Sequence, residues 1–232
     1  MSAAKKSVIE LATRQVHAPR CICTALLDGS KPIRGGIPLC SSLRRRRGIP
    51  NHGFARVNNW KLSQLDQTVK LFANALATAI HIQNKSEGDM AFQALLHTYL
   101  SVDDVRDGGV VVEGLKGLTY HDKVAGQEKT EERDVLTFDQ ETDSVYANAH
   151  GKEQVVTIEK EAFIKSGPTH TAQLSDVVVW NPWIDKAKGM SDFGDDEYPT
   201  MVCVEPGRVS EQQKLPAGQT FALLQVIKLS AL

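Results

Sequence analysis

Residues 176–183 read DVVVWNPW, and this stretch together with MVCV at positions 201–204 decides the fold class. Similar runs occur at positions 110–112, 155–158 and 221–229, separated by Gly, Asp, Asn and Pro. Short β-branched and aromatic runs with such separators are typical of antiparallel strands. Their spacing is too short for repeated β-α-β crossovers. We therefore predict a mainly β protein, built as a large antiparallel β-sandwich.

The composition is that of an ordinary globular protein and excludes several function classes. The chain has 232 residues, of which 41% are hydrophobic and 24% charged, and its formal net charge is −1. There is no overall positive field to hold nucleic acid or an anionic membrane. No run of residues has the roughly 18 to 20 apolar positions of a membrane span. An anionic ligand would have to be bound by a local cluster of cations.

The four cysteines favour a reduced, cytoplasmic protein without a bound metal. Cys21 and Cys23 are too close for the usual zinc spacing, and neither Cys40 nor Cys203 adds a second ligand pair. Residues 1–6 are polar and lack the apolar stretch of a secretory signal. We expect thiols rather than disulfides, as is usual in the cytosol.

Several different short motifs that carry polar and aromatic residues follow one another along the chain. They are KPIRGGIP at 31–38 with NHGFAR at 51–56, ALLHTYLSV at 94–102, ETDSVY at 141–146, and the series WNPW at 180–183, MSDF at 190–193 and MVCVEPG at 201–207. In this order the motifs resemble the hexose-6-phosphate mutarotases of the aldose 1-epimerase (galactose mutarotase-like) superfamily. The resemblance implies a large β-sandwich that opens a sugar cleft on one face and needs neither a metal nor an organic cofactor.

The resemblance covers residues 31–232, which we expect to form the mutarotase-like domain, while residues 1–30 form a divergent N-terminal segment. Where the family continues into a Phe-Pro loop, this chain carries four consecutive arginines at positions 44–47. The stretch from 60 to 84 is also short for the strands that the family places there. We expect a sandwich abridged on its N-terminal side.

The apolar residues from Leu62 to Ile80 recur three or four positions apart, which is the spacing of a helix. The resemblance instead implies a strand over residues 76–83. We follow the resemblance there and leave the conformation of residues 61–73 open.

Opening a sugar hemiacetal requires a base that removes the anomeric proton and an acid that protonates the ring oxygen. By resemblance, Glu205 is the base and His97 the acid. Taken alone, His97 fits a core histidine at a strand end better than a catalytic acid. Glu205 follows an apolar run, so we place it at the end of a strand, turned either to solvent or into a cleft. Taken without the resemblance, Trp180 and Trp183 fit aromatic residues of the core.

A sugar phosphate also needs cationic groups that can make forked contacts, which guanidinium supplies. By resemblance, Arg34 and Arg56 bind the substrate. Asn51 stands where the family usually has a longer Gln, and Asp143 matches the sugar-binding aspartate. Taken alone, the arginines fit ordinary surface ion pairs and Asp143 fits a turn.

The resemblance therefore implies an isomerase that interconverts the α and β anomers of hexose 6-phosphates, chiefly glucose 6-phosphate. The alternative is a catalytically impaired homologue that still binds sugar phosphates. A module that binds nucleic acid or a partner through the arginines at 44–47 fits less well, because no aromatic platform accompanies them. We expect a monomer that binds a small-molecule hexose 6-phosphate. We expect it to bind neither nucleic acid nor a membrane.

Overall fold

The computed structural model describes residues 39–40, 68–71, 75–149, 154–158, 162–167 and 175–231. Within these ranges the chain is mainly β, and the prediction of a mainly β antiparallel sandwich is confirmed. The strands are β1 Leu39–Cys40, β2 Thr68–Leu71, β3 Ala75–Gln83, β4 Met90–Leu96, β5 Tyr99–Ser101, β6 Val110–Glu113, β7 Thr119–Asp122, β8 Gln127–Thr130, β9 Val135–Leu136, β10 Thr142–Tyr146, β11 Gln154–Ile158, β12 Ala162–Gly167, β13 Asp176–Asn181, β14 Met201–Leu215 and β15 Thr220–Ala231. The helices are α1 Trp183–Lys188 and the 3₁₀ turns η1 Arg106–Gly108 and η2 Tyr198–Thr200.

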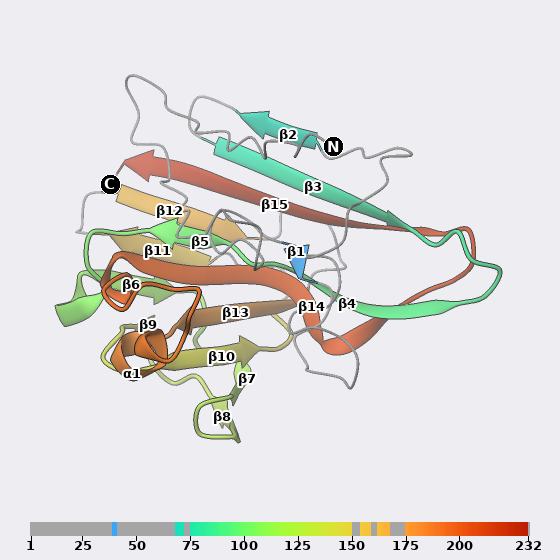
Figure 1. The fold of residues 1–232 in the computed structure, drawn as a ribbon. Coiled ribbons are helices and arrows are strands. Elements are labelled where there is room, and N and C mark those ends of the chain that lie inside the picture. Colours follow the sequence, from blue (N-terminus) through green and yellow to red (C-terminus); the bar gives the residue numbers. More distant parts are fainter. Residues whose placement is uncertain are drawn as a thin grey trace, which may run out of the picture.

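The strands form two sheets that lie as two layers (Figure 1). In the described residues the first sheet has the order β1-β4-β14-β13-β10-β7-β8, with β5 also paired to β14. The second has the order β2-β3-β15-β12-β11-β6-β9. Every recorded pairing is antiparallel, as the short chain segments between strands require. No helix in the described ranges is long and apolar enough to cross a membrane.

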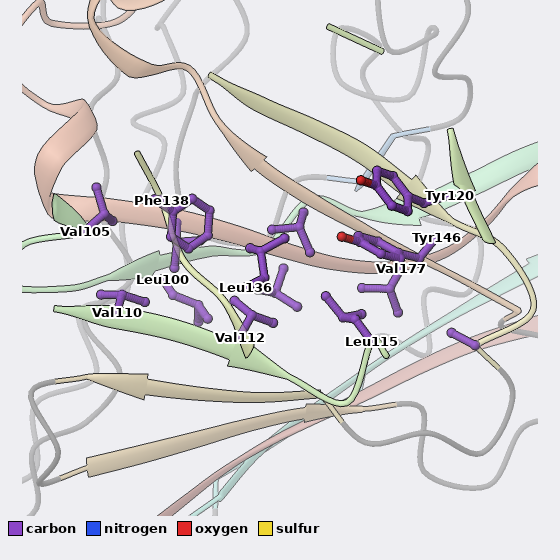
Figure 2. Close-up of a cluster of buried hydrophobic side chains, with 14 of the residues drawn as sticks. Leu100, Val105, Val110, Val112, Leu115, Tyr120, Leu136, Phe138, Tyr146 and Val177 are labelled. Atoms are coloured by element: carbon purple, nitrogen blue, oxygen red, sulfur yellow. The ribbon is translucent and has the colours of Figure 1, made fainter. Parts of the chain in front are cut away.

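The main core fills the space between the two sheets (Figure 2). Tyr120, Tyr146 and Val177 contribute from the first sheet. Val110 and Val112 contribute from the second. Burying an aliphatic side chain of this size stabilises a protein by about 1.5–3 kcal/mol. The cluster therefore fixes the two layers, and with them the positions of the strands that carry polar residues on the opposite face.

The first half of strand β14 is buried on both faces, which explains its uninterrupted apolar start. Val202 and Val204 belong to the core between the sheets. Met201 and Cys203 pack on the other face of the first sheet, beneath α1 and the chain that follows it. Successive side chains of a strand alternate between faces, so Glu205 lies on the same outer face as Cys203.

Two chain connections join the sheets side by side at one corner. One links β3 to β4 and the other links β14 to β15. The backbone N–H of Asn84 donates to the carbonyl of Gln219, and the N–H of Gly218 donates to the carbonyl of Asn84. The Asn84 side chain donates to the carbonyl of Leu215 at 2.8 Å. This buried amide ties the connection before β4 to the last residue of β14.

Two expectations about local structure met different outcomes. Residues 76–83 lie within strand β3, so the helical spacing of the apolar residues there did not decide the conformation. Pairing of β3 with β15 along its length, and with β2 from Leu76 to Ala79, outweighs the local pattern. The expectation that Glu205 ends a strand was wrong, because β14 continues to Leu215. The boundary between residues 30 and 31 lies outside the described residues.

Candidate functional site

His97 stands at the break between strands β4 and β5. The N–H of Thr98 donates to the carbonyl of Leu96 at 2.8 Å, which turns the chain tightly at this point. The Thr98 hydroxyl points into the protein and lies 2.8 Å from the side-chain oxygen of the buried Gln225 on β15. The anchoring of Thr98 on the inside leaves the neighbouring His97 on the outer face of the first sheet.

The imidazole of His97 meets the carboxylate of Glu205 on that face. The Nδ1 atom of His97 lies 3.3 Å from Oε1 of Glu205, and both side chains are almost completely buried. The pairing of Leu95 with Gly207 brings the two strands into this register. Imidazole and carboxylate groups can both serve as general acids or bases.

Aromatic rings enclose the His97 imidazole on two sides. Tyr99 stacks on it with ring centroids 4.7 Å apart and an interplanar angle of 10°. Trp180 meets it edge-on at 5.8 Å. Both rings come from neighbouring strands, because Tyr99 and Trp180 each pair with Cys203 of β14. These contacts fix the plane of the imidazole and so the direction in which its ring nitrogens point.

Each residue of the WNPW motif has a structural role. Trp180 is the wall beside His97, and the Asn181 amide donates to the carbonyls of Tyr198 and Met201. Pro182 follows the last residue of β13 and precedes α1. Trp183 has a φ of 56°, in the left-handed region that bulky residues avoid. Its N–H donates to the side-chain oxygen of Asn181 at 2.9 Å, which holds this turn in place.

Asp143 lies in the same row of the sheet as Trp180, Cys203 and Tyr99, because each pairs with the next across neighbouring strands. Cross-strand partners point to the same face. The Asp143 carboxylate therefore lies on the face that carries His97. The carboxylate accepts a hydrogen bond of 2.6 Å from Nζ of Lys123. The backbone N–H of Lys123 also donates to the carbonyl of Asp143.

Gly207 allows strands β4 and β14 to approach closely beside Glu205. A Cβ added at this position would lie 2.7 Å from the carbonyl oxygen of Ala94 and 2.9 Å from Cδ1 of Leu95. Real side chains do not make contacts this short with backbone atoms, so any other residue would push the strands apart. The distance between His97 and Glu205 depends on this close approach.

The structure thus brings together His97 and Glu205 and places Asp143 on the same face. The other expected substrate-binding residues, Arg34, Asn51 and Arg56, lie outside the described residues, as do the arginines at 44–47. Sequence reasoning missed Tyr99 as a wall of the site, and it did not place Cys203 on the same face of the sheet. The signal for Cys203 was available, since a residue two positions before Glu205 in a strand shares its face.

Comparison with known proteins gives the family. Residues 64–228 match the family model described as aldose 1-epimerase. The chain belongs to the aldose 1-epimerase family. It is 30% identical to the "Putative glucose-6-phosphate 1-epimerase" of Cenchrus ciliaris, over 85% of this chain and 70% of the relative. A protein of the same name from Escherichia coli K12 is also 30% identical, over 85% of this chain and 75% of its own length.

Solved structures agree with this membership. The crystal structure of a "putative mutarotase (YeaD)" from Salmonella typhimurium superposes with a TM-score of 0.71 and 26% identity, covering 90% of this chain and 78% of the other. The Slr1438 protein of Synechocystis sp. PCC 6803 superposes with a TM-score of 0.68 at 17% identity, covering 90% of this chain and 82% of its own, which shows a shared fold. Membership of the aldose 1-epimerase family supports a sugar mutarotase activity for the chain.

Proposed function

We propose that the chain interconverts the α and β anomers of hexose 6-phosphates, chiefly glucose 6-phosphate, by opening and closing the sugar ring. The observation that carries this proposal is the 3.3 Å contact between the buried imidazole of His97 and the buried carboxylate of Glu205. The family supports sugar mutarotation, and two curated relatives carry glucose-6-phosphate 1-epimerase in their names.

The geometry of the pair fits the chemistry of a hemiacetal. The anomeric hydroxyl and the ring oxygen are bonded to the same carbon, so the base and the acid that serve them must be close neighbours. Glu205 and His97 are neighbours of that kind. Because Nδ1 of His97 faces Glu205, we assign Nε2 as the atom that protonates the ring oxygen, in an orientation fixed by stacking on Tyr99.

In the proposed reaction Glu205 accepts the proton of the anomeric hydroxyl while His97 donates a proton to the ring oxygen. The bond between C1 and the ring oxygen breaks, and C1 becomes an aldehyde carbon. Rotation about the C1–C2 bond presents the other face of the aldehyde. On closure His97 takes the proton back from the attacking hydroxyl and Glu205 returns its proton to the anomeric oxygen. Both groups recover their starting states, so no net proton is consumed.

Sugar hydroxyls are the proposed partners of Asp143. Its carboxylate now accepts a contact from Lys123 and lies on the same sheet face as the reacting pair. We further propose that Arg34 and Arg56 bind the phosphate and that Asn51 contacts the substrate, on the strength of the family resemblance. A reduced thiol such as Cys203 fits a cytoplasmic setting, which we propose for the enzyme.

Anomer exchange of glucose 6-phosphate, followed by exchange NMR on the purified protein, tests the proposal. We expect exchange above the spontaneous rate, and faster exchange for glucose 6-phosphate than for glucose at equal concentration. Arg34→Ala should weaken binding of the phosphorylated sugar by about 1.5–3 kcal/mol, the value of a hydrogen bond to a charged group, without affecting glucose. Binding of glucose 6-phosphate with no exchange above the spontaneous rate would identify the chain as an impaired binding homologue.

A further inference from the structure

Three side chains with different metal-ligating atoms meet at the candidate site. The ligand atoms of His97, Cys203 and Glu205 all lie within 4.8 Å of one another, and all three side chains are buried. From the sequence we expected no bound metal. We propose that these residues form a binding site for a thiophilic divalent cation of the Zn²⁺ class, and that the bound cation inhibits anomer exchange. The inhibition rests on the proposed function, whereas the binding itself does not.

The placement of the ligands comes from the register of two strands. Cys203 and Glu205 are two positions apart on β14, so both side chains project from one face. His97 reaches the same point from the end of β4. Zinc binds sulfur at about 2.3 Å and nitrogen or oxygen at about 2.0–2.2 Å, which puts ligand atoms roughly 3.3–3.8 Å apart in a tetrahedron. The His97–Glu205 distance of 3.3 Å already lies in that range.

The ligand types select the metal. One thiolate and one carboxylate would balance the double charge of the cation, and a neutral imidazole would complete a set of three protein ligands. Sets of three leave a fourth position for water or for a substrate oxygen. Mg²⁺ and Ca²⁺ prefer several oxygen ligands and are poor matches for a set that includes sulfur and nitrogen. The rings of Tyr99 and Trp180 pack against the imidazole of His97, which fixes its orientation toward the metal position.

Binding of the cation would disable the base of the acid–base pair and would also engage the imidazole of the acid. A carboxylate oxygen that coordinates a metal is a much weaker base, so Glu205 could no longer accept the anomeric proton. The imidazole of His97 would be held toward the metal by the nitrogen that now faces Glu205. Cys203 has no part in the proposed reaction. Its removal should therefore abolish the inhibition and leave the exchange rate of the metal-free protein unchanged.

Co²⁺ is the probe for the site, because a thiolate bound to Co²⁺ produces a charge-transfer absorption band. We expect this band when Co²⁺ is added to the full-length reduced protein, and its disappearance when Zn²⁺ displaces Co²⁺. Cys203→Ser should abolish the band. A matched control that replaces the three other cysteines, Cys21→Ser with Cys23→Ser and Cys40→Ser, should retain it. Absence of the band from this control, or its persistence in Cys203→Ser, would overturn the proposal.

Exchange of glucose 6-phosphate after preincubation with Zn²⁺ or with a chelator tests the inhibition. We expect Cys203→Ser to need at least tenfold more Zn²⁺ for half inhibition than the triple control, with chelator-treated rates that agree within about twofold. Equal sensitivity to Zn²⁺ in the two variants would overturn the inhibitory role. If Cys203→Ser does not fold, judged by its thermal transition, Cys203→Ala takes its place. If the protein shows the cobalt band but no anomer exchange, the proposed function is wrong and the proposed metal site is retained.

Discussion

Two buried carboxylates on the neighbouring strands β13 and β14 face different kinds of partner. Glu205 pairs in register with Val178, and Asp176 pairs with Gly207 two positions away, so both carboxylates project from one face of the sheet. Each is only 1% exposed. Asp176 accepts hydrogen bonds from the N–H groups of Val209 and Ser210 at 2.7 and 2.6 Å, while Glu205 faces the imidazole of His97.

The difference separates a structural carboxylate from the proposed catalytic base. Hydroxyls of Ser210 and Ser175 complete the partners of Asp176, and neither hydroxyls nor backbone amides take up protons near neutral pH. The strand pairing of β14 with β4 shifts register between Arg208 and Gln213, and Asp176 binds the backbone within that irregularity. Burial alone therefore does not mark a catalytic group. The nature of the partner that a buried carboxylate faces is the informative feature.

Replacing Glu205 by Gln should give the largest effect on activity. The amide keeps the shape of the side chain but cannot accept the anomeric proton. We expect anomer exchange of glucose 6-phosphate to slow by about 10²–10⁴, the usual contribution of one positioned acid or base, with little change in the thermal unfolding temperature. A folded Glu205→Gln protein with an unchanged exchange rate would end the assignment of Glu205 as the base.

Replacing Asp176 by Asn is the matched control, with the opposite outcome. The amide oxygen can still accept from the backbone, but the hydrogen bonds lose their charge. We expect the free energy of unfolding to fall by about 1–3 kcal/mol, measured by urea denaturation, while the exchange rate of the folded protein changes less than about threefold. A collapse of exchange with full stability would show that the two carboxylates are not distinct in role.

Replacing Tyr99 by Leu should have a smaller effect, because it removes the stacked partner of His97 and keeps an apolar group on the strand. An aromatic pair of this kind is worth about 0.5–1.5 kcal/mol beyond its buried area. We expect exchange to slow by roughly 2–10-fold through a less well fixed imidazole. Tyr99→Phe keeps the stack and should restore the rate, which separates ring packing from any effect of the hydroxyl.

A third buried carboxylate, Glu131, extends the comparison to pH dependence. Burial tends to raise its pKa, but hydrogen bonds from Arg133 and Tyr146 together outweigh burial and hold the pKa below its ordinary value of 4.5. A group whose pKa is lowered by folding stabilises the protein above its unfolded pKa, and this stability is lost as the pH falls through the folded pKa.

Glu131→Gln should therefore destabilise the protein at neutral pH and matter less in acid. We expect a loss of about 0.5–1 kcal/mol at pH ~7, a modest value because Arg133 is half exposed. The difference from the parent protein should shrink as the pH falls below 4.5. Urea denaturation at several pH values measures it. If the difference in the free energy of unfolding stays constant with pH, hydrogen bonds from Arg133 and Tyr146 do not lower the pKa of Glu131.

Sequence patterns predicted the strands with strong apolar or β-branched content, such as β13 and the start of β14. They could not predict β8, whose four residues are polar and exposed, because it owes its conformation to pairing with β7. They also missed α1, a helix of only six residues that begins at a left-handed Trp183. Helical spacing before residue 80 gave the wrong structure for β3, since cross-strand pairing is not encoded in local periodicity.

The candidate site was predicted from the ordered motifs and not from spacing. Nothing in the local sequence indicates that Leu95 pairs with Gly207, and this register is what sets His97 beside Glu205. The contact between Asp143 and Lys123 was also unforeseen, because it joins a strand to a turn twenty positions earlier. Residues that share a strand, by contrast, have predictable faces, which is why Cys203 could have been placed beside Glu205.

The place of β14 in the first sheet also determines when the protein can complete its fold during synthesis. β14 lies between β4 and β13, although the ribosome makes it after both. Until it emerges, β4 and β13 each present an unpaired row of backbone groups to solvent, and the halves of the sheet have no strand to join them. Unpaired edges of this kind invite pairing with other chains. The nascent protein is thus most vulnerable to aggregation just before its last two strands arrive, and ribosome pausing or chaperone capture at that point would protect it.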